Sequence, residues 1–389
     1  MTFPRTLFVN QSSEIGGGEL ALFDFVRSLP GAHVAVFAPG PFLDLLQSAG
    51  VAASVVDAGA VLGVKRDAGI TASLKGGMGL AQLSLRLRRL ARDYDVIYAN
   101  SQKAFMAAAP AALLARKPLI WHLHDILSPE HFSGVLRRVT VTLANRIADR
   151  VIANSAATRA MFVEQGGRVP VEVVHNGIDP APFCDGVDPR ARAELARTLG
   201  TGDAPIVGIF GRLAAWKGQE VAIRALADLP DHHLVLVGGP LFGEHAYEEH
   251  LHRVTAQLNL GSRVHFLGFR RDVAALMCAV DVVVHSSIFA EPFGRVIVEG
   301  MMASRPVVAT AAGGALEIIE HDRSGLLVPP NDVLALVQAL RQLSTDPGHA
   351  AKLAQGGRER ALNVFALPAS ITRLRNVIEA VVGERNKGT

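Results

Sequence analysis

The sequence predicts an α/β protein built from two doubly wound domains, each a parallel sheet with helices between successive strands. Short apolar runs rich in β-branched residues alternate with helical stretches along most of the 389-residue chain, which is typical of βαβ units. A chain of this length exceeds one ordinary hydrophobic core. The alternation breaks near residues 179–203, where the turn-rich segment DPAPFCDGVDP separates two series of elements.

The first series contains continuous apolar runs, as expected for strands whose two faces are both covered by helices. Strands are predicted at Leu7–Val9, His33–Phe37, Val51–Val56, Val96–Ala99, Leu119–His122, Arg150–Ala153 and Val171–Val174. Helices are predicted between them at Leu20–Ser28, Pro41–Ser48, Leu80–Ala91, Ala104–Ala115, Ser133–Ala148 and Ser155–Glu164. The glycine-rich, weakly patterned segment 59–79 predicts a mobile loop.

The second series repeats this pattern after a short helix at Arg190–Leu199. Strands are predicted at Ile206–Phe210, His233–Val237, Val264–Phe266, Val282–His285, Val307–Ala309 and Gly325–Leu327. Helices are predicted at Gln219–Leu226, Ala246–Leu258, Arg271–Ala279, Arg295–Ala303, Leu316–Glu320 and Val333–Leu343, followed by a last run at Ala369–Val382. We therefore divide the chain into residues 1–185, residues 186–366 and a terminal helical segment, 367–389.

Composition and charge exclude several classes of protein. The 39 Lys and Arg against 36 Asp and Glu give a net charge of only +3, so no nucleic-acid partner is indicated. The two cysteines form no CxxC or Cys/His cluster, so neither a disulfide framework nor structural zinc is indicated. Asp93-Tyr94-Asp95 has the D-x-D form of a metal–diphosphate site, but it precedes its strand and so belongs to the sheet edge away from ligands.

The chain carries no signal for a membrane span. It has no uninterrupted apolar run of about 18 residues, and its first residues do not resemble a secretory signal. We therefore expect a cytoplasmic protein. The basic helix with Arg86, Arg88, Arg89 and Arg92 leaves open a peripheral contact with anionic lipid at the inner face of a membrane, beside the simpler interpretation as a solvated face. The sequence does not indicate an oligomeric state.

The stretch 286–300, SSIFAEPFGRVIVEG, carries two carboxylates, Glu291 and Glu299, eight positions apart. It follows a predicted buried strand and leads into a predicted helix, and a helix N-terminus at a strand's carboxyl end favours anions. Gly294 allows the backbone to come close to a ligand. The residues alone leave a plain alternative open, in which one glutamate is solvated and the other caps the helix.

Two cations follow the strand predicted at Ile206–Phe210. Arg212 and Lys217 are five positions apart, and together they can bind a pair of phosphates, Arg212 as a planar fork and Lys217 as a point charge. The pattern GxxxxGK[ST] is absent, so this is no Walker A loop. Solvated surface cations remain the alternative.

The first series also offers polar groups just after its strands. Gly16, Gly17 and Gly18 open the first helix and let the backbone approach a ligand, but Ala21 takes the last position of GxGxxG, so the dinucleotide fingerprint is not met. His124 follows the strand Leu119–His122 and can hydrogen-bond a substrate hydroxyl. A plain turn and a surface histidine are the alternatives.

Taken together, these motifs resemble the retaining family 4 glycosyltransferases, which have the GT-B fold of two Rossmann-like domains facing each other across a cleft. The matching segments run in the family's order: GGGE at 16–19, LHD at 123–125, ADRVIANS at 148–155, VVHNGID at 173–179, GRLAAWKG at 211–218, LVLVGG at 234–239, VHFLGF at 264–269, EPFGRVIVEGMMASRPVVAT at 291–310, GGALEII at 313–319 and SGLLVPPND at 324–332. The Glu-x7-Glu spacing from Glu291 to Glu299 is the most specific of them.

The resemblance implies a role for each candidate residue. Arg212 and Lys217 would bind the donor diphosphate, Glu299 the ribose, and Glu291 the transferred sugar. His124 would face the sugar hydroxyls. The remaining donor contacts would come from the backbone near Phe293, Gly294, Arg295 and Val296, from Gly17 and Gly18, and from Leu267–Arg270 near the base, which includes Phe269 and Arg270. The terminal segment 367–389 would cross back onto the first domain.

The resemblance also implies a reaction: transfer of a sugar from a nucleoside-diphosphate sugar to an acceptor hydroxyl, with retention and without a metal or other cofactor. Base, sugar and acceptor, whether a glycan, a lipid-linked molecule or a small molecule, are not indicated. We hypothesise same-face attack by the acceptor, assisted by the leaving phosphate. A nucleotide-sugar epimerase or a phosphorylase of the same fold, an NAD-dependent oxidoreductase and a non-catalytic nucleotide-sugar-binding subunit are the alternatives.

Overall fold

The structure is a computed structural model that describes residues 3–57, 70–184, 190–240 and 243–387. The chain divides into two compact units, Met1–Gly177 together with Leu367–Thr389, and Ile178–Ala366. The boundary predicted after residue 185 lies eight residues beyond Gly177. Within the described ranges, no helix has the length and apolar content needed to cross a membrane.

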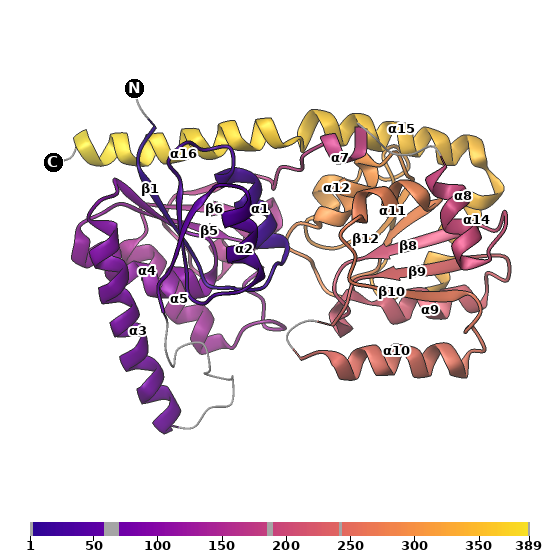
Figure 1. Cartoon of the computed structure of the whole chain (residues 1–389), viewed down its shortest axis with the longest axis horizontal. Coiled ribbons are helices and arrows are strands. Elements are labelled where there is room, and N and C mark those ends of the chain that lie inside the picture. The colour runs from indigo at the N-terminus through magenta and orange to yellow at the C-terminus, as the bar shows by residue number, and fades with distance from the viewer. Residues whose placement is uncertain (1–2, 58–69, 185–189, 241–242, 388–389) are drawn as a thin grey trace. The chain divides into compact units, whose positions relative to one another are not determined.

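The first unit is built on a parallel sheet of seven strands in the order β3-β2-β1-β4-β5-β6-β7 (Figure 1). The strands are β1 (Thr6–Asn10), β2 (His33–Val36), β3 (Ala52–Val55), β4 (Val96–Ala99), β5 (Leu119–Leu123), β6 (Arg150–Ala153) and β7 (Val171–Val173). The helices are α1 (Gly17–Val26), α2 (Pro41–Ser48), α3 (Ile70–Ala91), α4 (Gln102–Ala115), α5 (Gly134–Ile147), α6 (Ala156–Glu164) and the terminal α16 (Leu367–Lys387).

Alternate residues of these strands pack on opposite faces of the sheet, as the two-residue period of a strand requires. Leu7 and Val9 belong to a core covered by α3, α4 and α5, whereas Phe8 belongs to a core covered by α1, α2 and α16. In Figure 1, α16 is the yellow helix that runs past β1, and its Leu374 and Ile378 lie in the same core as Phe8. The terminal helix is therefore part of the first unit.

The second unit repeats the plan with six parallel strands in the order β10-β9-β8-β11-β12-β13. The strands are β8 (Ile206–Phe210), β9 (His233–Val237), β10 (Val264–Gly268), β11 (Val282–His285), β12 (Val307–Thr310) and β13 (Leu326–Val328). The helices are α7 (Ala181–Cys184), α8 (Ala191–Leu199), the 3-10 turn η2 (Ala215–Lys217), α9 (Gln219–Ala227), α10 (His245–Gln257), α11 (Val273–Ala279), α12 (Arg295–Met302), α13 (Ala315–Ile318), α14 (Val333–Thr345) and α15 (Pro347–Val364).

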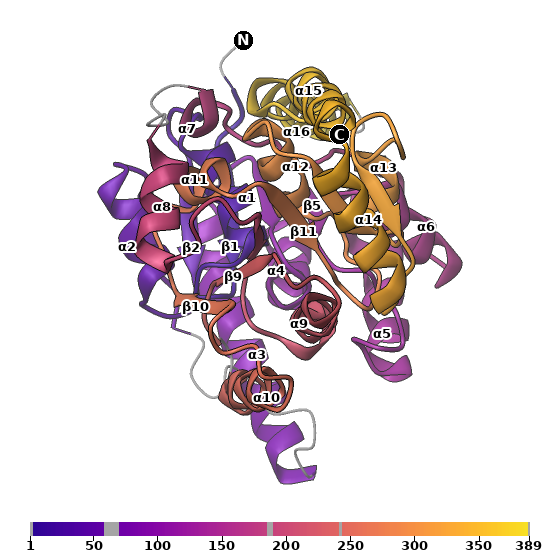
Figure 2. The ribbon, with the colours of Figure 1, turned by 90° about the vertical axis from the view of Figure 1, so that its right-hand side faces the viewer.

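This sheet is also covered on both faces. One face packs against α9, α10 and α14 and the other against α8, α11 and α12, as Figure 2 shows. The predicted architecture of two parallel-sheet α/β domains is thus confirmed. The predicted loop was wrong over residues 70–79, which are helical, and the helices α7 and α15 were not predicted. The rest of the predicted loop, residues 59–69, lies outside the described residues.

Candidate functional site

The candidate site of the second unit lies where the strand order of its sheet reverses. β8 and β11 are parallel neighbours although they are far apart in sequence, and the chain leaves both strands at the same edge of the sheet. The segment after β8 carries Arg212 and Lys217, and β11 ends in His285, six residues before Glu291. Doubly wound sheets bind ligands outside the carboxyl ends of the strands at such a reversal.

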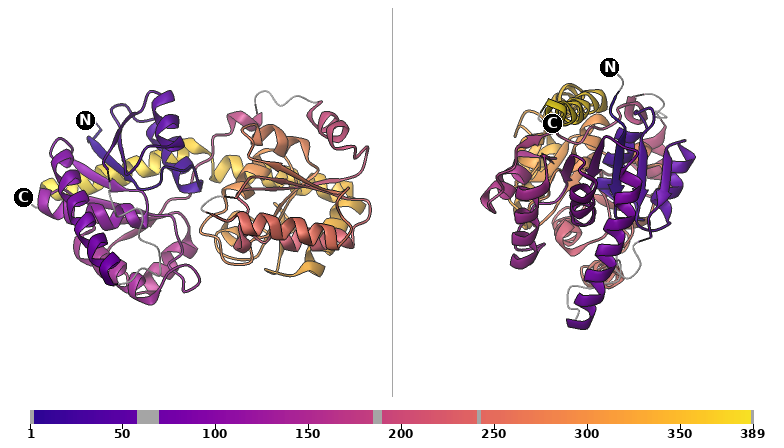
Figure 3. Two further views of the ribbon diagram at one scale, coloured as in Figure 1. Left: turned by 60° about the horizontal axis from the view of Figure 1, so that its bottom comes forward. Right: turned by 90° about the vertical axis from the view of Figure 1, so that its left-hand side faces the viewer.

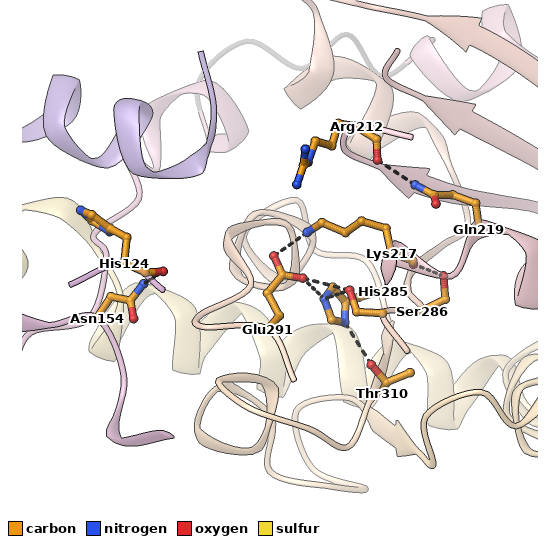
Figure 4. A network of polar contacts seen from close by, with 10 residues as sticks. His124, Asn154, Arg212, Lys217, Gln219, His285, Ser286, Glu291 and Thr310 are labelled. Carbon is orange, nitrogen blue, oxygen red and sulfur yellow. Dashed lines mark hydrogen bonds and ion pairs between the residues drawn. The ribbon is translucent and has the colours of Figure 1, made fainter. Parts of the chain in front are cut away.

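Each carboxylate oxygen of Glu291 is contacted by a nitrogen of a neighbouring basic side chain. Nζ of Lys217 donates to Oε1 at 2.5 Å, and Nε2 of His285 lies 2.5 Å from Oε2. The hydroxyl of Ser287 donates to the same Oε2 at 3.0 Å. The side chains of Lys217 and Glu291 are 17% and 13% exposed, so the carboxylate is enclosed but reachable. Figure 4 shows Lys217 and His285 converging on Glu291.

This environment sets the charge of Glu291. Burial raises the pKa of its carboxyl, but the charges of Lys217 and His285 and their hydrogen bonds outweigh burial and hold that pKa well below its usual range. On the far side of the imidazole, Oγ1 of Thr310 lies 3.5 Å from Nδ1 of His285. Glu291 is therefore an anion across the physiological pH range, in an orientation fixed by three neighbouring side chains.

The segment that carries Lys217 is attached to the chain that leaves β11. The Ser286 hydroxyl donates to the Lys217 carbonyl at 3.1 Å, and the Ile288 amide donates to the Trp216 carbonyl at 2.9 Å. Gly218 has φ +67°, and a Cβ there would lie 2.1 Å from the Ser286 carbonyl oxygen. Only glycine fits this left-handed, closely packed position, so the sequence Lys217-Gly218 places the ammonium beside Glu291.

Arg212 lies on the same loop and approaches the same aromatic ring as Lys217. Its guanidinium carbon is 5.6 Å from the centre of the Trp216 ring, and the Lys217 Nζ is 4.4 Å from it. Arg212 also donates to Glu244 at 3.3 Å, and its carbonyl accepts a hydrogen bond from Gln219. Arg212 and Lys217 thus both approach the Trp216 ring, and their joint binding of a phosphate pair stays a prediction.

The stretch from Phe293 to Glu299 contains the turn before α12 and the first residues of that helix. Phe293 is buried against Phe365, and Gly294 is the N-cap residue, which leaves Arg295 and Val296 in the first helical turn. Amide groups of a first turn have no carbonyl partner within their own helix. Glu299 lies one turn further on and forms an ion pair with Arg295 at 3.5 Å.

The segment predicted to lie near the base, Leu267–Arg270, contains the last two residues of β10 and the two residues after it. Phe269 is 75% exposed, and the Arg270 guanidinium makes a two-point contact with the Asp272 carboxylate, at 2.8 and 2.5 Å. An aromatic ring this exposed, directly after a strand that adjoins β9 in the same sheet, offers a stacking surface for a planar ligand.

The candidate residues of the first unit form a separate polar network. Nε2 of His124 lies 2.9 Å from Oδ1 of Asn100, and Asn100 donates to the Gly18 carbonyl at 3.2 Å and to Asn10 at 3.0 Å. A Cβ on Gly18 would lie 3.5 Å from the His124 ring, which is ordinary contact. Gly17 is the first residue of α1. β1 and β4, which end beside Asn10 and Asn100, are the strands at which this sheet reverses its order.

His122 and His124 differ in their surroundings. His122 is buried and its Nδ1 lies 2.6 Å from the Tyr98 hydroxyl; burial, followed by the neighbouring His124, holds the His122 pKa well below its usual value. His124 is only partly buried, and its carbonyl accepts a hydrogen bond from Asn154 (Figure 4). His124 is therefore the one of the two that can meet a ligand.

Several residues of these networks were not predicted from the sequence. They share one signal, which is a polar side chain at or just after the end of an apolar strand. In the second unit these are His285, Ser287 and Thr310, and in the first unit Asn10, Asn100 and Asn154. Trp216 gave no such signal, since it lies inside η2.

Comparison with known proteins places both units in one family. Residues 15–182 match the family model described as Glycosyltransferase Family 4, and residues 192–360 match that of Glycosyl transferases group 1. The crystal structure of HepE from Anabaena in complex with UDP and glucose has a TM-score of 0.88 and is 39% identical, over 97% of this chain and 99% of HepE.

Two curated relatives agree with this placement. A GDP-mannose-dependent α-(1-6)-phosphatidylinositol monomannoside mannosyltransferase of Mycolicibacterium smegmatis is 32% identical over 72% of this chain and 75% of its own length. A D-inositol 3-phosphate glycosyltransferase of Salinispora tropica is 34% identical over 61% of this chain. The match spans only about half of the latter relative, 52%.

Proposed function

The chain belongs to glycosyltransferase family 4, with the GT-B fold, and on this premise we propose that it transfers a sugar from a nucleoside-diphosphate sugar to an acceptor hydroxyl. The observation that carries the proposal is the cluster of Arg212, Lys217 and Glu291 at the reversal of the second sheet. In this cluster, two cations would bind the diphosphate, and one anion would stabilise positive charge that develops on the sugar.

The chemistry follows from where charge develops. As the glycosidic bond breaks, the leaving diphosphate gains negative charge, which Arg212, Lys217 and the first turn of α12 would stabilise. The sugar becomes oxocarbenium-like and would be stabilised by the Glu291 carboxylate. Glu299 would bind the ribose. His124 and the backbone at Gly17 and Gly18 would contact the sugar or the acceptor.

We propose that the reaction retains the anomeric configuration and needs no metal. The acceptor would attack from the face that the diphosphate leaves, and the leaving phosphate would take the acceptor's proton, so that no carboxylate forms a covalent intermediate. Glu291 suits this role because Lys217 and His285 already hold both of its oxygens, which makes it a poor nucleophile. The cations would supply the charge that Mg²⁺ supplies in metal-dependent transferases.

For the donor we propose a UDP-hexose, with a GDP-hexose as the second candidate. The first choice rests on HepE, whose structure with UDP and glucose resembles this chain over 97% of its length. The second rests on the GDP-mannose-dependent relative, which matches over less of the chain. The base would stack near Phe269, which is 75% exposed.

For the acceptor we propose a hydroxyl on a lipid-linked molecule, since the mycobacterial relative acts on a phosphatidylinositol monomannoside. We further propose a cytoplasmic enzyme that touches the inner face of a membrane, and the next subsection argues which surface would do so. An epimerase of the same fold remains the second candidate function.

Hydrolysis and transfer assays test the proposal. The protein is incubated with UDP-glucose or GDP-mannose in EDTA, and NMR follows the released sugar from its first turnover. The expected result is slow donor hydrolysis in EDTA that gives first the anomer of the donor, and a loss of at least about 10²-fold in Lys217→Ala. Hydrolysis that requires a divalent metal, or that gives the inverted anomer, contradicts the mechanism. Conversion of the nucleotide sugar without release of nucleotide identifies an epimerase.

A further inference from the structure

The charge of the first unit is concentrated on three consecutive helices. The sequences of α3, α4 and α5 contain no Asp or Glu. Residues 70–147, which include these helices and their connections, contain eleven Lys and Arg against four Asp and Glu, whereas the whole chain has 39 against 36. The rest of the protein is therefore net acidic, and the weak overall charge hides a basic region.

The three helices form one layer. α4 packs against both α3 and α5, and the inner sides of all three cover the same face of the sheet, through residues such as Leu83, Ala108 and Val141. Figure 3 shows α3 as the long purple helix at the side of the first unit. The outer sides of these helices are not needed to complete that core.

The outer side of α5 combines exposed apolar and basic residues at helical spacing. Val135, Arg138, Val139 and Arg146 follow one another at intervals of three, one and seven residues, which places them on one face. All four are exposed, Val135 by 76% and Val139 by 46%. Valine side chains that stay exposed to water at these positions contribute little hydrophobic stabilisation to the folded protein.

The outer side of α3 has the same composition. Met78, Leu85 and Arg89 are exposed and recur at helical spacing, and Arg92, just after the helix, is exposed as well. Met78 is exposed by 68%. Between the two helices, the end of α4 exposes Leu113 and Leu114. Single exposed apolar residues are ordinary on a soluble protein. Here they gather on three neighbouring helices that lack any acidic side chain.

We infer that this outer face of α3, α4 and α5 docks onto a membrane that carries anionic lipid. The apolar side chains would enter the boundary between headgroups and acyl chains, and the arginines would meet the lipid phosphates. A nucleic acid would match the charge but leave the valines and leucines in water. A second copy of the chain would bring two basic faces together. The exposed apolar residues and the absence of acidic ones together favour the membrane.

This inference rests on the membrane contact within the proposed function. Its test measures vesicle binding, whereas the test of the proposed function measures donor hydrolysis. The full chain is floated with vesicles of phosphatidylcholine alone or with phosphatidylglycerol added. Wild type is expected to float only with the anionic vesicles. Arg138→Gln/Arg146→Gln should weaken this binding by about fivefold for each arginine removed, and Val135→Ser/Val139→Ser by about tenfold. UDP binding, measured on the same samples, should not change in either variant.

A matched variant of the second unit serves as control. Leu334 and Arg253 are exposed by 67% and 61%, and Leu334→Ser/Arg253→Gln should bind anionic vesicles like wild type. The inference is overturned if wild type does not float with anionic vesicles, if it floats equally with phosphatidylcholine alone, or if both α5 variants bind as wild type does. It is also overturned if the α5 substitutions abolish self-association or oligonucleotide binding and leave vesicle binding unaltered. If wild type does not bind UDP, that result would instead count against the proposed function.

Discussion

The ammonium of Lys217 and the carboxylate of Glu291 lie 2.5 Å apart, although 74 residues separate them in the sequence. The fold brings them together because β8 and β11 are neighbours in the sheet. A donor diphosphate would therefore approach an ammonium that already has an anionic partner, and Glu291 would help to orient Lys217 before the donor arrives.

The first prediction concerns the energetic coupling of this pair. Either Lys217→Ala or Glu291→Ala leaves an opposite charge largely buried without this partner, which is costly, so the double substitution should cost less than the sum of the two. We expect a coupling of about 1–3 kcal/mol in urea unfolding of the second unit. The exposed pair Glu249 and Arg253, 3.9 Å apart, serves as control and should show almost none. Additive costs at Lys217 and Glu291 would contradict the contact.

The second prediction concerns His285 as a positioning residue for Glu291. His285→Ala should lower the rate of donor hydrolysis by between about tenfold and 10²-fold, because Glu291 loses one of the groups that fix its orientation. His285→Gln keeps a hydrogen-bond donor and should recover part of the loss, with little change in KM. His245→Ala, at an exposed histidine of α10, is the control. Equal losses in the alanine and glutamine variants would argue against positioning.

The third prediction uses two glycines with nearly the same backbone conformation. Gly218 has φ +67° and packs on the Ser286 carbonyl, whereas Gly200 has φ +70° and would give an added Cβ open space. Gly200→Ala should cost about 1 kcal/mol of stability from its left-handed backbone alone. Gly218→Ala should cost more and should lower donor hydrolysis, because it displaces Lys217. Similar effects of the two substitutions would show that the contact with Ser286 is unimportant.

The fourth prediction concerns pH and the first unit. Burial holds the pKa of His122 well below its usual value, so below about pH 6.5 the unfolded chain takes up a proton that the folded protein excludes. The contribution of the neutral His122 to the free energy of unfolding is therefore fully present above this pH. It falls as the pH decreases, by up to about 1.4 kcal/mol per pH unit. His122→Gln should reduce this slope. Unfolding is followed by the fluorescence of the neighbouring Trp121, in a Trp216→Phe background. An unchanged slope in His122→Gln would contradict the assignment.

The strands could be predicted closely from the sequence because parallel strands buried on both faces are continuous apolar runs. β6, β8, β9 and β11 begin and end where their runs do. The start of α3 and the whole of α15 were missed because glycines such as Gly77 and Gly356 have low helix propensity. In α15 the glycine has a packing reason: a Cβ on Gly356 would lie 2.3 Å from the Arg323 carbonyl oxygen.

The candidate site could be predicted only as far as single motifs allow. The spacing of Arg212 and Lys217, and the pattern from Glu291 to Glu299, indicated which residues matter. The network around Glu291 could not be predicted, because it joins segments from β8, β11 and β12 whose neighbourhood depends on strand order. His285 in particular ends an apolar strand and was taken as part of it.

The central claim is that Arg212 and Lys217 bind the diphosphate of a nucleotide sugar, and calorimetric titration with UDP tests it most directly. Wild type should bind UDP in EDTA, and Arg212→Ala and Lys217→Ala should each weaken binding by at least about tenfold, the size of one charge-assisted hydrogen bond. Lys352→Ala, which removes an exposed lysine of α15, should bind like wild type. UDP binding that is unaffected by both substitutions, or the absence of binding by UDP, GDP, ADP and dTDP alike, would contradict the claim.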